Sequence, residues 1–153
     1  MSEKHRKQGI AISFYRFERW FYTHHMRHLA QIAHRFMQII LGCTIPPGVE
    51  LGKNVRIPHF HGIVIHHQSK IGDRTIIYQN VTIGGRNGQI GAIVGSDCII
   101  GAGSCLLGNI KIGNHVKIGA NAVVLEDIPD GCTVVGVPGK IINQDPYFTP
   151  PNI

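Results

Sequence analysis

Apolar residues recur at every sixth position through the second half of the chain. Between residues 94 and 125 they are Val94, Ile100, Leu106, Ile112, Ile118 and Val124. Glycine follows this residue in four of the six repeats, and a small or β-branched residue lies four positions after it. A period of six residues is typical of a parallel β-helix, because one short repeat cannot bury its aliphatic side chain unless further coils stack upon it. The pattern therefore predicts a β-solenoid.

The same period continues upstream, with two interruptions. The phase shifts by two residues after Ile57, and five additional residues separate Ile83 from Val94. Insertions leave a solenoid as loops, and such loops tend to gather on a functional face. The first break contains residues 58–62 and the second contains residues 84–91, so we expect functional residues at these two places.

The first quarter of the chain follows a helical period instead. Apolar residues between Phe14 and Leu41 recur at helical spacing, no Pro or Gly interrupts them, and Gly42 supplies a C-terminal stop. A weak point near Thr23 divides this stretch into two predicted helices. The predicted organisation is a helical segment over 1–42 with residues 1–11 frayed, a β-helix over 43–142, and an extended, loosely held tail over 143–153.

Two interpretations of the helical segment remain open. The simpler one is a cap, because the exposed end of a solenoid needs a cover. The other is a basic amphipathic segment, over residues 13–41, that rests on an anionic membrane through Trp20, Phe21 and Tyr22. His24 and His28 are four residues apart but lack a carboxylate partner, so we expect a solvated face and no metal site there.

Composition narrows the class of protein. The 153 residues carry a net charge of +6, with a pI near 9.4, and the basic excess lies in the first quarter. No nucleic-acid-binding motif accompanies it, so we expect no nucleic-acid partner. There is no CxxC pair, and Cys98 lies at an inward position, which favours buried thiols without disulfides. Without a signal peptide or a membrane-spanning run, we expect a cytoplasmic protein, with contact at the inner membrane face left open.

Five segments together resemble a known superfamily. They are IPHFHGIVI (57–65), VTIGG (81–85), IGAGSCLLGNIKIG (100–113), KIGANAVV (117–124) and GVPGK (136–140). With the hexads, they resemble the left-handed β-helix acyltransferases, in particular serine acetyltransferases and short polysaccharide O-acetyltransferases of the colanic-acid type. The resemblance implies a left-handed coil, a homotrimer with active sites at subunit interfaces, acetyl-CoA as co-substrate, and no metal.

The resemblance places a general base at His59, in the first break. A hydroxyl is too weak an acid to ionise at neutral pH, and a neutral imidazole takes its proton as it attacks a thioester. A backbone N–H of the second break would stabilise the oxyanion. By the same resemblance, the residues that line the CoA groove or meet its phosphates are Gly84, Gly85, Ala102, Ala120, Lys117 and Lys140.

Three further residues are candidates for binding the acceptor or orienting His59: His61, Thr44 and Arg86. A purely structural role for His61 stays equally open. The histidines at positions 66, 67 and 115 are expected to be solvated.

Several positions depart from the serine acetyltransferase pattern. That pattern has Asp where this chain has Thr44 and Pro58, and an Asp-Arg-His run where this chain keeps only Arg86. The ammonium group of serine calls for a carboxylate, and neither break contains one. We therefore expect an acetyl-CoA-dependent O-acetyltransferase acting on a sugar or surface-polysaccharide hydroxyl. Serine O-acetylation for cysteine synthesis is the alternative; a non-catalytic β-helix scaffold and a zinc carbonic-anhydrase-type β-helix follow.

Overall fold

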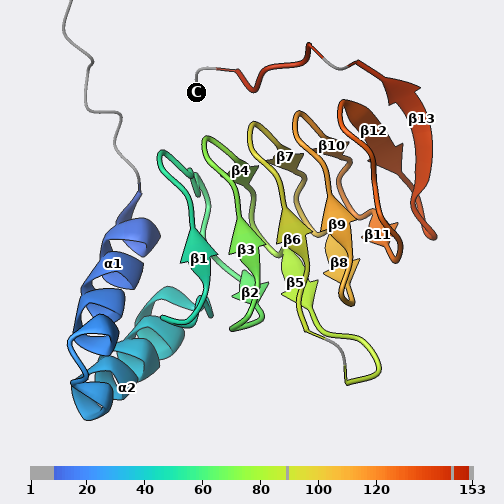
Figure 1. Ribbon diagram of the computed structural model, residues 1–153. Coiled ribbons are helices and arrows are strands. Elements are labelled where there is room, and N and C mark those ends of the chain that lie inside the picture. Colours follow the sequence, from blue (N-terminus) through green and yellow to red (C-terminus); the bar gives the residue numbers. More distant parts are fainter. Residues whose placement is uncertain (1–8, 89, 146, 152–153) are drawn as a thin grey trace, which may run out of the picture.

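The computed structural model describes residues 9–88, 90–145 and 147–151, and shows a helical cap on one end of a stack of β-coils (Figure 1). The helices are α1 (Ile10–Thr23), α2 (Arg27–Phe36) and a short π-helix, η1 (Met37–Leu41). The left-handed φ of 58° at Gly42 ends the last of these. The two predicted helices are therefore confirmed, and they separate after Thr23. Residues 10 and 11, expected to fray, are helical, whereas residues 1–8 lie outside the described residues.

Thirteen short strands follow within the described residues. They are β1 (Glu50–Leu51), β2 (Val64–Ile65), β3 (Lys70–Ile71), β4 (Ile76–Ile77), β5 (Thr82–Gly84), β6 (Ile93–Val94), β7 (Ile99–Ile100), β8 (Cys105–Leu107), β9 (Lys111–Ile112), β10 (Lys117–Ile118), β11 (Val123–Val124), β12 (Cys132–Val135) and β13 (Lys140–Gln144). They form three sheets, each of which is one side of the coil. Face A is β2-β5-β8-β11, face B is β1-β3-β6-β9, and face C is β4-β7-β10-β12-β13. All pairings are parallel except β12 with β13, so the predicted parallel β-helix is confirmed.

The six-residue period forms the core. The six aliphatic residues from Val94 to Val124 are each at most 3% exposed, and every one stacks in register on its counterpart in the next coil. Cys98 is also fully buried, and burial raises the pKa of its thiol to about 11. It therefore behaves as a small apolar residue and is not a reactive nucleophile.

The three corners between the faces differ in what they tolerate. At the corner from face B to face C, glycines stack in a column, and a Cβ on Gly95 would lie 2.5 Å from the carbonyl oxygen of Gly113. At the corner from face A to face B, the equivalent position holds larger residues such as His66 and Leu107. The glycines after the hexad aliphatics are thus required where adjacent backbones approach closely.

The C-terminal segment returns along the outside of the coils (Figure 1). The ammonium of Lys117 lies 3.7 Å from the ring centroid of Phe148, and His115 Nδ1 donates to the Phe148 carbonyl at 2.6 Å. Arg56 Nη2, in the first coil, donates to the carbonyl of Pro151 at 2.7 Å. We expected a loosely held tail; instead it makes polar and cation–π contacts from the last coils to the first, and His115 is half-buried by them.

Candidate active site

The first break projects His59 from the corner between faces C and A. The backbone of His61 and Gly62 keeps the coil in register, because the His61 carbonyl accepts the Asn80 N–H at 2.9 Å and Gly62 N–H donates to Gly42 at 2.8 Å. The additional residues therefore bulge outward, and His59 is exposed. Phe60 packs against the core and stacks on the His61 ring, with centroids 4.4 Å apart. His61 is thus positioned by an aromatic contact, while His59 is free to meet a ligand.

Several predicted groove residues share this edge. Ala102 and Ala120 lie at the same corner in successive coils, where the Asn121 N–H donates to the Ala102 carbonyl at 2.9 Å. The next turn carries Gly136 to Lys140, and its Gly139 N–H donates to Val123 at 2.7 Å. The structure therefore aligns His59, the two alanines and Lys140 along one side of the solenoid. Lys117 lies on face C, where the Phe148 ring covers its ammonium.

The second break lies on the opposite edge of face A. Gly84 ends β5, the Gly84 carbonyl accepts the Gly108 N–H at 2.9 Å, and the chain then leaves the corner between faces A and B, projecting beyond the coils (Figure 1). Gly85 and Arg86 are exposed there. One chain therefore does not bring His59 and this loop together, and a site that uses both takes them from two copies. Thr44 lies on face A itself, paired with Val64.

Sequence reasoning missed the role of His66. Its Nδ1 accepts the backbone N–H of Gly91 at 3.2 Å and that of Gln68 at 3.3 Å, and its ring packs against His67 with centroids 4.4 Å apart. An accepting Nδ1 carries no proton, and burial and His67 lower the pKa of His66 below its ordinary 6.5. The ring therefore anchors the end of the 84–91 loop at neutral pH and releases it only in acid. The sequence feature that could have revealed this role is the position of His66, at the same corner as the 84–91 insertion and one coil before it.

Replacing His66 with Leu is expected to loosen the 84–91 loop, because Leu offers no acceptor to the Gly91 N–H. Trypsin cleavage after Arg86 should then be about fivefold faster, the effect of losing one net hydrogen bond. His66→Asn retains an acceptor at the same place and should resemble the unmodified chain. Equal cleavage rates for the Leu and Asn variants would show that this hydrogen bond does not hold the loop.

No cluster of three His, Cys, Asp or Glu side chains suitable for a metal ion occurs among the residues that the structure describes. The four cysteines are all unpaired.

Comparison with known proteins shows which proteins this chain resembles. Residues 91–126 match the family described as bacterial transferase hexapeptide (six repeats). Serine acetyltransferases from Synechococcus elongatus and Mycobacterium tuberculosis are 38% and 43% identical over 86% and 88% of this chain. Of solved structures, Neisseria gonorrhoeae serine acetyltransferase in complex with serine has a TM-score of 0.83 and 34% identity, covering 87% of this chain and 55% of that one. A serine acetyltransferase in complex with CoA has a TM-score of 0.81 and 34% identity, with 86% and 55% covered.

The chain thus has the left-handed β-helix fold of the solved serine acetyltransferases, and its residues 91–126 carry the hexapeptide repeat of bacterial transferases. Among such proteins, the ones it is similar to are serine acetyltransferases. It spans 55% and 60% of the length of the two curated relatives.

These matches overturn the expected sugar or polysaccharide acceptor. Relatives and structural neighbours alike are named serine acetyltransferases. The inference failed because it required a carboxylate inside one of the two breaks. In the folded chain, Glu126 and Asp127 reach the same edge as the 84–91 loop from a later coil. A missing carboxylate within a sequence segment therefore does not exclude an amino-acid acceptor.

Proposed function

We propose that this chain is an acetyl-CoA-dependent O-acetyltransferase whose acceptor is L-serine, supplying O-acetylserine for cysteine synthesis. The observation that carries the proposal is the similarity to serine acetyltransferases over 86–88% of the chain, together with an exposed histidine at the first break of the coil. Both substrates are cytoplasmic metabolites, so we place the protein in the cytoplasm.

His59 is the general base in this mechanism. The imidazole takes the proton of the serine hydroxyl as the oxygen attacks the thioester carbon of acetyl-CoA. The resulting tetrahedral intermediate carries its negative charge on the former carbonyl oxygen, and a backbone N–H at Gly84 or Gly85 stabilises it. When the intermediate collapses, the C–S bond breaks and the imidazolium returns its proton to the CoA sulfur. No covalent enzyme intermediate forms, which agrees with the burial of Cys98.

CoA is proposed to lie along the edge that His59 shares with Ala102 and Ala120. Small side chains there let an extended pantetheine arm approach backbone groups closely. Lys140, exposed at the far end of this edge, is the better placed of the two proposed lysines to meet phosphate. Lys117 would first have to release Phe148.

A homotrimer is proposed because the two breaks occupy opposite edges of face A. A neighbouring chain, rotated about an axis parallel to the solenoid, presents its 84–91 loop to the first chain's His59. Arg86 of that loop is then available to the serine carboxylate, while His61 and Thr44 remain candidates for orienting His59 or the acceptor.

Acetyl transfer to L-serine is the direct test. The purified chain, given acetyl-CoA and L-serine, is expected to release CoA thiol and form O-acetylserine, both of which increase with serine concentration until saturation. Thiol release in the absence of acceptor measures background hydrolysis. D-serine and L-alanine, which lack either the correct configuration or the hydroxyl, are matched controls. No thiol release above background with L-serine would overturn the proposed acceptor.

A further inference from the structure

The outer surface of the helical cap is apolar. Trp20 of α1 is 51% exposed, Ile32 of α2 is 66% exposed, and Ile39 of η1 is 78% exposed. On α2 and η1 the exposed apolar residues follow helical spacing and form one stripe: Leu29, Ile32, Phe36, Ile39 and Ile40. Phe14 of α1 stacks on Phe36 with ring centroids 6.2 Å apart. This contact joins the stripe to the exposed apolar residues of α1, such as Trp20. A cap needs only one buried face, so capping the coil does not by itself account for this outer apolar surface.

The same helices present positive charge and no exposed negative charge. Residues 10–41 contain four arginines and a single carboxylate, Glu18, which is fully buried. Its Oε2 accepts a hydrogen bond from His34 Nδ1 at 3.1 Å, so this carboxylate has its partner inside the protein and adds no negative charge to the surface. The arginines at positions 16, 27 and 35 thus give the cap surface an uncompensated positive potential.

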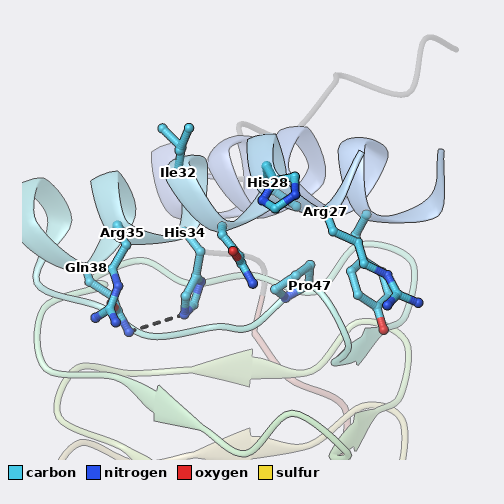
Figure 2. A pocket seen from close by; sticks show the side chains of 10 residues that line it. Arg27, His28, Ile32, His34, Arg35, Gln38 and Pro47 are labelled. Atoms are coloured by element: carbon cyan, nitrogen blue, oxygen red, sulfur yellow. Dashed lines mark hydrogen bonds between the residues drawn. The ribbon is translucent and has the colours of Figure 1, made fainter. Parts of the chain in front are cut away.

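A groove beside α2 gathers part of this charge. It has a volume of about 960 Å³, and its lining includes Arg27, Arg35, His28 and His34 but no acidic residue. Figure 2 shows His34, Arg35 and Gln38 directed toward the solenoid side of α2, whereas Ile32 points the opposite way. The two arginines are eight positions apart, or about 12 Å along a helix. The cap therefore combines an apolar outer stripe with basic side chains on its flank.

A chain of hydrogen bonds fixes the basic flank. Arg35 Nη1 donates to Gln38 Oε1 at 3.2 Å, and Gln38 Nε2 faces His34 Nε2 at the same distance. With His34 Nδ1 donating to Glu18, each group donates to the next, ending at the buried carboxylate. This arrangement holds Arg35 in place, and within the described residues its other N–H groups are left to an anion.

A second copy of the chain is a poor occupant of this surface. Symmetric pairing of two caps would bring arginines against arginines, with no exposed carboxylate in residues 10–41 to neutralise them. An anionic lipid surface matches both properties, since acidic headgroups neutralise the arginines while Trp and aliphatic side chains enter the interfacial region. No helix in the described residues is long and apolar enough to cross a bilayer, so the contact is peripheral.

We propose that the α1–α2–η1 cap docks this protein on anionic lipid bilayers, with the apolar stripe inserted and the arginines against the headgroups. The proposal is independent of the acceptor of acetyl transfer.

Vesicle co-sedimentation of the full chain tests it. Vesicles of phosphatidylglycerol mixed with phosphatidylcholine should bind the protein, whereas vesicles of pure phosphatidylcholine should bind it weakly. Added salt should weaken binding to the vesicles that contain phosphatidylglycerol. Ile32→Asp should reduce binding at least tenfold, because a charge replaces an inserted aliphatic side chain. Ile142→Asp is the matched control, since Ile142 is 64% exposed on β13, away from the cap. Arg27→Gln and Arg35→Gln should each weaken binding to the anionic vesicles about fivefold.

Three outcomes would overturn the proposal: no difference between anionic and neutral vesicles, equal effects of Ile32→Asp and Ile142→Asp, or a cap that only associates with other copies. The last is recognised when Ile32→Asp lowers the particle mass in sedimentation but the unmodified protein ignores vesicles. Transfer of acetyl groups to soluble L-serine should be unchanged in all these variants, so failure of docking and failure of the proposed reaction are distinguishable.

Discussion

His59→Ala is expected to lower kcat/KM for acetyl transfer by a factor of about 10²–10⁴, the usual contribution of a positioned general base. Without the imidazole, the acceptor hydroxyl must lose its proton to water while it attacks the thioester. His59 is exposed, and the structure describes no hydrogen bond or ion pair to its side chain. The free energy of unfolding should therefore change by no more than about 0.5 kcal/mol. Thiol release and urea unfolding, at one protein concentration, measure the two quantities.

His67→Ala is the matched control for this experiment. His67 is also an exposed histidine, but it lies at the corner that carries the 84–91 loop, on the other edge of face A. Its removal should leave catalysis within a fewfold of the unmodified chain. If His59→Ala retains full activity, the assignment of the base to the first break is wrong.

The hexad pattern was sufficient to predict the parallel coil and its core. A buried aliphatic residue every six positions has no other simple structural explanation, and the residues from Val94 to Val124 are buried as expected. The period alone does not distinguish the three corners. Gly95 and Gly113 stack against one another, whereas His66 occupies an equivalent position at a corner with room for a side chain. That difference arises from coil-to-coil contacts, which a linear pattern does not contain.

The candidate site was predicted only in part. The sequence indicated that His59 and the 84–91 loop interrupt the coil, but not that they leave by opposite edges of face A. The anchoring of the loop by His66 joins residues 25 positions apart, and the docking of Phe148 on Lys117 joins residues 31 positions apart. Such contacts depend on which coil lies above which. The acceptor was mispredicted for a related reason, because residues from other coils contribute to the same edge of the solenoid.

Gly95→Ala is expected to destabilise the fold by about 3 kcal/mol, in the upper range for forcing atoms into a packed interior. The new Cβ would lie 2.5 Å from the Gly113 carbonyl oxygen and 2.7 Å from the Gly113 carbonyl carbon. Both atoms are backbone, so no side chain can rotate away and the two coils must separate locally. The strand pairs on either side of this corner, β6 with β9 and β7 with β10, would be disturbed. Urea midpoints, with oligomeric state monitored by sedimentation, measure the loss.

Substitution of Gly42 is the control that distinguishes this steric clash from the ordinary conformational cost of replacing a glycine. Its φ of 58° is unfavourable for Ala, but no atom of the described residues lies within 4 Å of the position that a Cβ would occupy. Gly42→Ala should therefore cost only about 1–2 kcal/mol, and Gly42→Asn less, because Asn tolerates left-handed backbone. The ordering Gly95→Ala, Gly42→Ala, Gly42→Asn, from most to least destabilised, is the expected result. If Gly95→Ala proved as stable as Gly42→Ala, close approach of the coils would not be the reason for the glycine column, and the hexad glycines would have to be explained by backbone conformation alone.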